Sequence, residues 1–114
     1  MAHTGAARAG VENLTKTLAQ EWSEYNIRIN CVAPGIIESS GLDTYPQPIQ
    51  DMFEQAKAAI PLKRFGTTQD VSNAVCFLSS PLASYISGIS LCVDGAQHLN
   101  FNNMGLADTL KSFM

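Results

Sequence analysis

The feature that most constrains the fold is a short apolar strand that runs directly into a Pro-Gly turn at Pro34 and Gly35. Apolar and polar side chains alternate from Ile27 onward, and Val32 and Ala33 close the run, which is typical of a buried strand. Pro34 cannot donate to a sheet ladder and Gly35 tolerates almost any backbone angle, so we expect the strand to end here. Because ligands bind at the carboxyl ends of strands in open α/β sheets, the turn is either a ligand site or an ordinary strand-to-loop turn.

Helical periodicity predicts three helices around this strand. The first is expected from about Thr4 to Glu24, with its apolar face formed by Ala7, Val11, Leu14, Leu18 and Trp22. The second is expected over residues 49–59 and ends at Pro61, because proline cannot continue a helix. The third starts at Thr67 or Thr68, either of which is a plausible N-cap, and stops at Pro81.

A second strand is predicted where Ile89, Leu91 and Val93 alternate with other residues before the Asp94-Gly95 turn. The connection between the two strands contains helices, which implies a right-handed crossover and therefore a parallel pair over residues 27–32 and 89–93. Parallel strands are buried on both faces, and two strands with three helices cannot cover themselves. We therefore expect an α/β segment of a larger sheet.

Composition narrows the class of partner. The chain has 114 residues, is 46% hydrophobic and 15% charged, and carries a net charge of −3, which fits one modest core. The charge forms no basic stripe, so we expect neither nucleic acid nor a membrane surface as a partner. No apolar run is long enough to span a membrane and no leader is evident, so we expect an intracellular protein.

The cysteines and histidines suggest no metal or disulfide framework. Cys31, Cys76 and Cys92 are odd in number, widely spaced and set in apolar segments, so we expect buried thiols in a reducing compartment. His3 and His98 have no metal-ligand spacing, and neither is assigned a role.

Ordered blocks over roughly residues 3–100 resemble the C-terminal half of the short-chain dehydrogenase/reductase family. The blocks are HTGAARAGVENLTKTLAQEW (3–22), IRIN (27–30), APG (33–35), IPLKRFG (60–66), DVS (70–72), VCFL (75–78) and SGISLCVDG (87–95). The resemblance implies a Rossmann-like doubly wound parallel sheet, of which this chain holds about two strands and three main helices. Residues 1–100 are then the C-terminal segment of that domain, and residues 101–114 are a tail without a usable motif.

The family's catalytic pair is altered in this sequence. Members generally use a Tyr followed four residues later by a Lys, and alignment on residues 9–11 places Thr4 and Arg8 at these positions. A threonine hydroxyl is too weak an acid to donate a proton near neutral pH, whereas Arg8 keeps a positive charge suited to ribose or phosphate. A second register places Glu12 and Lys16 there, and it also lacks the phenol. The resemblance thus implies Thr4, Arg8 and Lys16 as catalytic candidates. The alternative role is a helix N-cap for Thr4 and a solvated helix face for Lys16.

The resemblance also implies a nicotinamide cofactor, NADP with NAD as the alternative. Its expected contacts are Arg8, Pro34, Gly35, Ile37 and Ser39, the backbone at Ile37 pairing with the nicotinamide carboxamide and the Ser39 hydroxyl reaching the pyrophosphate. No G-x-x-x-G-x-G motif precedes a helix in this sequence. We expect that glycine-rich turn, and the family's catalytic serine segment, upstream of Met1.

The resemblance implies a role for two further features, one in substrate handling and one structural. The loop from Gly41 to Pro48 resembles the family's substrate lid, with an ordinary surface loop as the alternative. Asn30 is expected to be a structural partner of neighbouring loops.

Two function classes remain open. The branch of the family that reduces enoyl thioesters in fatty acid metabolism needs a hydrogen bond to the enolate oxygen and a proton that water can supply, so it can tolerate the missing phenol. The first class is therefore an oxidoreductase segment acting on acyl-CoA-type small molecules, in the peroxisome or cytoplasm, and homo-oligomeric as in the family. The second is a non-catalytic truncated chain that associates with full-length relatives.

Overall fold

The computed structural model describes residues 2–38 and 40–99. Their main elements are α1 (Ala2–Glu21), β1 (Cys31–Pro34), α2 (Gln47–Ala59), α3 (Thr68–Ser79) and β2 (Ser90–Val93). Four short 3-10 helices connect them: η1 (Ser23–Tyr25), η2 (Leu42–Thr44), η3 (Pro81–Ala83) and η4 (Gln97–Leu99). The described chain divides into a first unit of residues 2–33 and 72–91 and a second unit of residues 34–38, 40–71 and 92–99. Ser39 and the expected tail at 101–114 lie outside the described residues.

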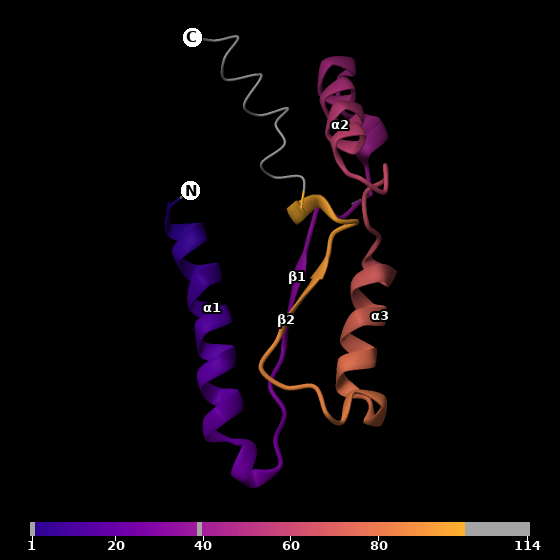
Figure 1. Ribbon diagram of the computed structural model, residues 1–114. Coiled ribbons are helices and arrows are strands. Elements are labelled where there is room, and N and C mark those ends of the chain that lie inside the picture. Colours follow the sequence, from indigo (N-terminus) through magenta and orange to yellow (C-terminus); the bar gives the residue numbers. More distant parts are fainter. Residues whose placement is uncertain (1, 39, 100–114) are drawn as a thin grey trace. The chain divides into compact units, whose positions relative to one another are not determined.

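Strands β1 and β2 form a parallel pair, as the sequence predicts (Figure 1). Cys31 N–H donates to the carbonyl of Ile89 at 3.0 Å, and Gly35 N–H donates to the carbonyl of Val93 at 3.0 Å, so both strands advance in the same direction. The α/β fold with a parallel crossover is confirmed. Regular pairing starts at Cys31 rather than at Ile27, because side chains replace ladder bonds before it, as where Ser87 Oγ accepts from Ile29 N–H at 3.2 Å.

Helix α1 buries small residues rather than its apolar face. Its buried residues are Thr15 and Ala19, whereas Val11 and Leu14 are 54% and 55% exposed. A Cβ placed on Gly88 would lie 3.4 Å from the Ala19 Cβ, so small side chains let the two segments approach closely. Close backbone approach thus uses the small-residue side of the helix, and Val11 and Leu14 of the apolar face remain more than half exposed.

Helices α2 and α3 lie close to their predicted ranges. Ile60, the residue after α2, is 2% exposed, and Phe65 is 5% exposed. At the start of α3, Asp70 N–H donates to Thr67 Oγ1 at 3.1 Å, and Thr67 N–H donates to Asp70 Oδ2 at 2.8 Å. This reciprocal pair is a capping box, and it confirms Thr67 as the N-cap.

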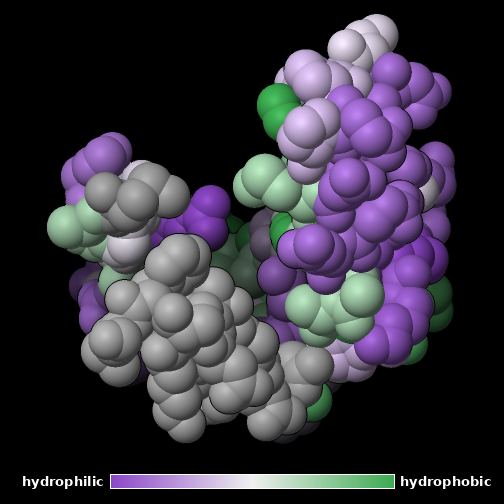
Figure 2. Space-filling model, turned by 90° about the horizontal axis from the view of Figure 1, so that it is seen from above, coloured by the Kyte–Doolittle hydropathy of each residue, from purple (hydrophilic) through white to green (hydrophobic). Residues whose placement is uncertain are grey.

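Few described side chains are fully buried. The buried ones are Thr15, Ala19, Ile60, Phe65, Leu78 and Ala83. On the face in Figure 2, hydrophilic residues predominate and hydrophobic ones form separate patches.

All three cysteines are free, as predicted, but Cys76 and Cys92 are exposed and Cys31 is half-buried. The expectation of buried thiols is therefore wrong for Cys76 and Cys92. None of the described helices combines the length and apolarity that crossing a membrane requires.

Candidate functional site

The turn after β1 is packed against the residue that follows β2. A Cβ placed on Gly35 would lie 2.6 Å from the Cβ of Asp94 and 3.0 Å from the side-chain oxygen of Gln97. Real Cβ atoms essentially never approach this closely, so only glycine fits here without a shift of its neighbours. The sequence identifies this turn as special, but the cause in the structure is contact within the protein.

Ile37 is held by the segment that precedes α3. It forms a parallel bridge with Gly66, in which Gly66 N–H donates to the carbonyl of Ile36 at 2.9 Å and Glu38 N–H donates to the carbonyl of Gly66 at 2.7 Å. In a parallel bridge, the bonds of the neighbouring residues fix the central residue and direct its own polar groups to the other side. The N–H and C=O of Ile37 have no hydrogen-bond partner in the part of the chain that the structure describes. The bonds of Ile36 and Glu38 to Gly66 therefore fix the position of the backbone between them.

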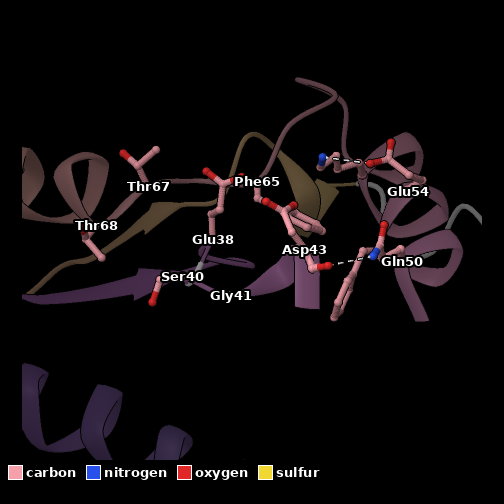
Figure 3. Close-up of a pocket in the computed structure, with 11 residues that line it drawn as sticks. Glu38, Ser40, Gly41, Asp43, Gln50, Glu54, Phe65, Thr67 and Thr68 are labelled. Atoms are coloured by element: carbon pink, nitrogen blue, oxygen red, sulfur yellow. Dashed lines mark hydrogen bonds and ion pairs between the residues drawn. The ribbon is translucent and has the colours of Figure 1, made fainter. Parts of the chain in front are cut away.

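A cavity of about 480 Å³ lies in the second unit beside this segment (Figure 3). The loop after β1, helix α2 and the start of α3 all contribute to it. Its lining residues are Glu38, Ser40, Gly41, Asp43, Gln50, Phe53, Glu54, Lys57, Phe65, Thr67 and Thr68.

The cavity has an acidic lining. The ammonium of Lys57 pairs with Glu54 at 3.1 Å and also lies 5.4 Å from the centre of the Phe65 ring, so the one lysine is already engaged. The carboxylates of Glu38 and Asp43 remain without an ion pair among the described residues. A net negative lining repels phosphate and suits uncharged polar or apolar groups.

The segment that resembles a substrate lid is partly ordered by α2. The side-chain amide of Gln50 donates to the carbonyls of Tyr45 at 2.8 Å and Asp43 at 3.3 Å. The Tyr45 ring meets Phe53 edge-on with centroids 5.7 Å apart. Helix α2 begins at Gln47, so the expected loop of residues 41–48 is shorter than predicted and contains η2.

The catalytic candidates all lie on α1, in the first unit. Thr4 is half-buried within the first helical turn, so its alternative role as the N-cap is wrong. Arg8 and Lys16 are exposed, and neither has an ion-pair partner among the described residues. The Glu12 carboxylate accepts from Ser90 Oγ at 3.3 Å. This hydrogen bond joins α1 to the first residue of β2.

The structure brings the predicted site residues together in two groups. Pro34, Gly35 and Ile37 share the second unit, while the candidates on α1 share the first. Asn30 has the structural role predicted for it, because its side chain donates to the carbonyl of Ile86 at 3.0 Å and accepts from Ile89 N–H at 3.1 Å.

The capping box beside the cavity carries a shifted acid. The Arg64 guanidinium donates to Asp70 Oδ2 at 2.9 Å, and with the Thr67 N–H it lowers the pKa of Asp70 from 3.8 to about 2. The same contact raises the pKa of Arg64. Asp70 thus stays ionised throughout the neutral range and holds the start of α3.

One cluster of potential metal ligands was not predicted from the sequence. Cys92, Asp94 and His98 lie together after β2, with ligand atoms all within 4.8 Å of one another. The signal was the spacing C-x-D-x-x-x-H, which matches none of the common zinc motifs.

The chain is similar to a known protein family and to several characterised relatives. A family model described as "Enoyl-(Acyl carrier protein) reductase" matches residues 1–98. Peroxisomal 2,4-dienoyl-CoA reductase of Pongo abelii is 41% identical over 109 residues, which cover 93% of this chain and 37% of that protein. The peroxisomal 2,4-dienoyl-CoA reductase of Saccharomyces cerevisiae is 44% identical over 94 residues, covering 82% and 32%. This chain therefore spans 32–37% of the length of these relatives.

Two solved structures are also similar to this chain in sequence and fold. A protein from Agrobacterium tumefaciens assigned as a 2-deoxy-d-gluconate 3-dehydrogenase, with NADP bound, is 37% identical with a TM-score of 0.72, covering 82% of this chain and 38% of that one. An oxidoreductase of the short-chain dehydrogenase/reductase family from Burkholderia thailandensis is 33% identical with a TM-score of 0.74, covering 95% and 41%.

Proposed function

We propose, from the premise that this chain belongs to the short-chain dehydrogenase/reductase family, that it forms the C-terminal half of an NADP-dependent trans-2-enoyl-CoA reductase. The relatives named as dienoyl-CoA reductases support an unsaturated acyl-CoA thioester as the substrate class. The bound NADP in the Agrobacterium protein supports a nicotinamide cofactor, with NAD as the alternative.

The observation that carries the proposal is the backbone of Ile37. Its bridge to Gly66 fixes the segment, and its N–H and C=O have no partner among the described residues. The N–H donor and the C=O acceptor of this one residue fit a primary carboxamide, which offers one acceptor and one donor in return. The nicotinamide carboxamide is such a group, so the residues present fit the cofactor at this end.

We assign roles to the remaining residues by the same proposal. The cofactor, when bound, supplies the hydride that reduces the β carbon of the enoyl thioester. Thr4 donates a hydrogen bond to the thioester oxygen, where negative charge develops, and Arg8 holds the ribose. Lys16 takes the role of Arg8 in the alternative register, and Ser39, which lies outside the described residues, is proposed to bind the pyrophosphate. The α carbon takes its proton from water or from a residue outside this segment.

The acidic cavity limits where the coenzyme A part can bind. Its unpaired carboxylates, Glu38 and Asp43, repel the phosphates of coenzyme A. We therefore propose that the cavity takes the uncharged pantetheine or acyl part and that the phosphates bind elsewhere.

The test joins this chain to a nucleotide-binding half from a family member and measures NADPH-dependent reduction of crotonyl-CoA. We expect activity in the joined protein. The 114-residue chain alone should neither reduce crotonyl-CoA nor bind NADPH tightly, because phosphate binding at a helix N-terminus requires the glycine-rich turn that this sequence does not contain. Saturation in an NADPH fluorescence titration of the chain alone, at about micromolar concentration, would contradict this.

Glu12→Gln in the joined protein tests the register. We expect little change in rate, because Glu12 bonds to Ser90 and is not placed as a proton donor. A loss of about a hundredfold, the scale of a general acid, would make Glu12 the missing donor and the proposed register wrong.

A second candidate function, an association module, is favoured by α1. Its exposed stripe carries Val11, Leu14 and Trp22, which are 54%, 55% and 40% exposed. Apolar surface of this kind drives association, so we propose that the chain self-associates or binds full-length relatives. Sedimentation at tens of micromolar, roughly the range in which exposed surface drives association, tests this, and a stable monomer would contradict it.

We also propose a peroxisomal location, with the cytoplasm as the alternative. The support is that the Pongo and Saccharomyces relatives are named as peroxisomal. Imaging of a fluorescent fusion of the full-length protein against a peroxisomal marker decides between the two.

A further inference from the structure

Three side chains with different donor atoms converge just after β2. The thiol of Cys92, the carboxylate of Asp94 and the imidazole of His98 offer sulfur, oxygen and nitrogen ligand atoms within 4.8 Å of one another. All three belong to the second unit and come from a stretch of seven residues, so local backbone is enough to bring them together.

The local backbone explains the convergence. Cys92 and Asp94 are two residues apart at the end of a strand, where side chains at i and i+2 point to the same face. The chain then folds back, because the carboxylate of Asp94 accepts from Ala96 N–H and from His98 N–H, both at 3.1 Å. The second of these bonds brings the His98 ring to 2.9 Å from the same carboxylate.

Asp94 is held from behind as well. Its Cβ lies against Gly35, at a spacing that leaves no room for a side chain on that residue. The Asp94 side chain is 10% exposed and His98 is 49% exposed, so the anchor is buried while the other donors are open to solvent. This combination gives a rigid ligand with an entry path from solution.

The donor set selects the metal class. Thiolate and imidazole ligands favour borderline and soft divalent ions such as Zn²⁺ and Co²⁺ over Mg²⁺ and Ca²⁺, which prefer oxygen. Zinc bond lengths of roughly 2.0–2.3 Å in a tetrahedron place ligand atoms about 3.5 Å apart. The observed spread of up to 4.8 Å therefore needs only small side-chain movements to close.

We propose that Cys92, Asp94 and His98 bind one divalent zinc-class ion, with water in the fourth position. On binding, the Cys92 thiol releases its proton to solvent and its sulfur forms a bond to the metal, while Asp94 and His98 each give one lone pair. No electron transfer takes place. The site stabilises the turn after β2, because an ion that binds only the folded arrangement favours it.

The first experiment uses Co²⁺ and Zn²⁺ salts as probes on the purified, reduced 114-residue chain. Titration with Co²⁺ is followed by absorption, where tetrahedral coordination by a thiolate gives visible d–d bands and a sulfur-to-cobalt charge-transfer band. We expect saturation at one ion per chain and displacement by Zn²⁺. Binding without the charge-transfer band, or stoichiometry that does not saturate, would overturn the site.

Matched variants then assign the ligands. Cys92→Ser and His98→Gln should each weaken Zn²⁺ binding by about tenfold or more. Cys76→Ser and His3→Gln remove an exposed residue of the same type elsewhere in the chain and should leave the affinity unchanged. Equal losses in both pairs would show adventitious binding and overturn the proposal.

A second measurement needs no variant and therefore cannot fail through misfolding. Cys76 and Cys92 are both exposed, so both should react with a thiol-alkylating reagent in the absence of metal. With Zn²⁺ present, mass spectrometry should find Cys92 protected and Cys76 still modified. Equal modification of the two in the presence of Zn²⁺ would contradict the site.

Discussion

The turn cluster, which we define as Gly35, Ile37, Ile60, Gly66 and Asp94, differs from helix α1 in how its residues are used. A Cβ on Gly35 would lie 2.6 Å from the Cβ of Asp94, whereas Gly5 and Gly10 of α1 have nothing within 4 Å of such an atom. Apolar side chains differ in the same way, because Ile60 is 2% exposed and Leu14 is 55% exposed.

This difference separates two kinds of sequence signal. In the turn cluster, the glycines and apolar residues are explained by contacts within the described chain, so their substitution should be costly. On α1, Val11 and Leu14 are more than half exposed in the part of the chain that the structure describes, so they should tolerate change unless a partner covers them.

The largest expected effect comes from truncating the buried side chain. Ile60→Ala should lower the free energy of unfolding by about 2–5 kcal/mol, because it removes buried methylene groups and leaves a cavity. Leu14→Ala removes a side chain of equal size from α1 and should change it by less than about 0.5 kcal/mol. Urea unfolding followed by circular dichroism measures both. Similar losses in the two variants would show that α1 is buried as tightly as the cluster.

The next effect distinguishes the two kinds of glycine. Gly35→Ala should destabilise by about 1–3 kcal/mol, because the new Cβ meets Asp94 and the neighbours must shift. Gly10→Ala lies in open space on a helix and should stabilise by roughly 0.5–1 kcal/mol. The two variants should therefore move the urea midpoint in opposite directions. A tolerated Gly35→Ala would mean that the turn is looser than its contacts indicate.

Two threonines, Thr67 and Thr4, should differ less in their effect on stability. Thr67→Ala should cost about 1 kcal/mol, because Asp70 N–H loses the hydroxyl that accepts its hydrogen bond. Thr4→Ala, in the first turn of α1, removes a side chain without a hydrogen-bond partner among the described residues and should change stability by less than about 0.5 kcal/mol. The same unfolding measurement compares them, and Thr67→Ser should restore most of the loss. Failure of serine to restore it would indicate that the threonine methyl group matters instead.

The sequence predicts what depends on near neighbours. The N-cap at Thr67, the end of α2 before Pro61 and the parallel strand pair all follow from residues a few positions apart or from the crossover rule. The burial of Thr15 and Ala19 on α1 could not be predicted, because periodicity finds an apolar stripe without revealing what lies against the other residues of the helix.

The sequence marks Gly35 through its Pro-Gly turn, and Ile37 enters only through the family resemblance. The close approach of Asp94 to Gly35 could not be predicted, because it joins segments that are distant in the chain. The proximity of Cys92, Asp94 and His98 depends on backbone bonds from Asp94 that fold the chain back, and residue spacing alone does not show such bonds.

The smallest expected effect is an acid-dependent loosening of the capping box. Asp70 has its pKa lowered to about 2 by Arg64 and by the Thr67 N–H, compared with 3.8 for an unperturbed aspartate. Because the folded form holds the proton less tightly than the unfolded chain, the stabilisation is complete above pH 3.8 and is lost as the pH falls toward 2. Helix α1 has no acidic residue in its first turn, so its start should not respond through such a group.

Carboxyl-detected NMR titration measures this midpoint directly. Arg64→Gln should raise the pKa of Asp70 toward 3.8, because the guanidinium at 2.9 Å is the largest cause of the shift. Added salt should raise the pKa of Asp70 by less than Arg64→Gln does. Salt screens the charge attraction, because the Arg64 side chain is 57% exposed, but the hydrogen bond between the two side chains survives. A wild-type Asp70 that titrates near 3.8 would mean that the capping box is open in solution. The turn cluster and α1 would then differ only in how tightly their side chains pack.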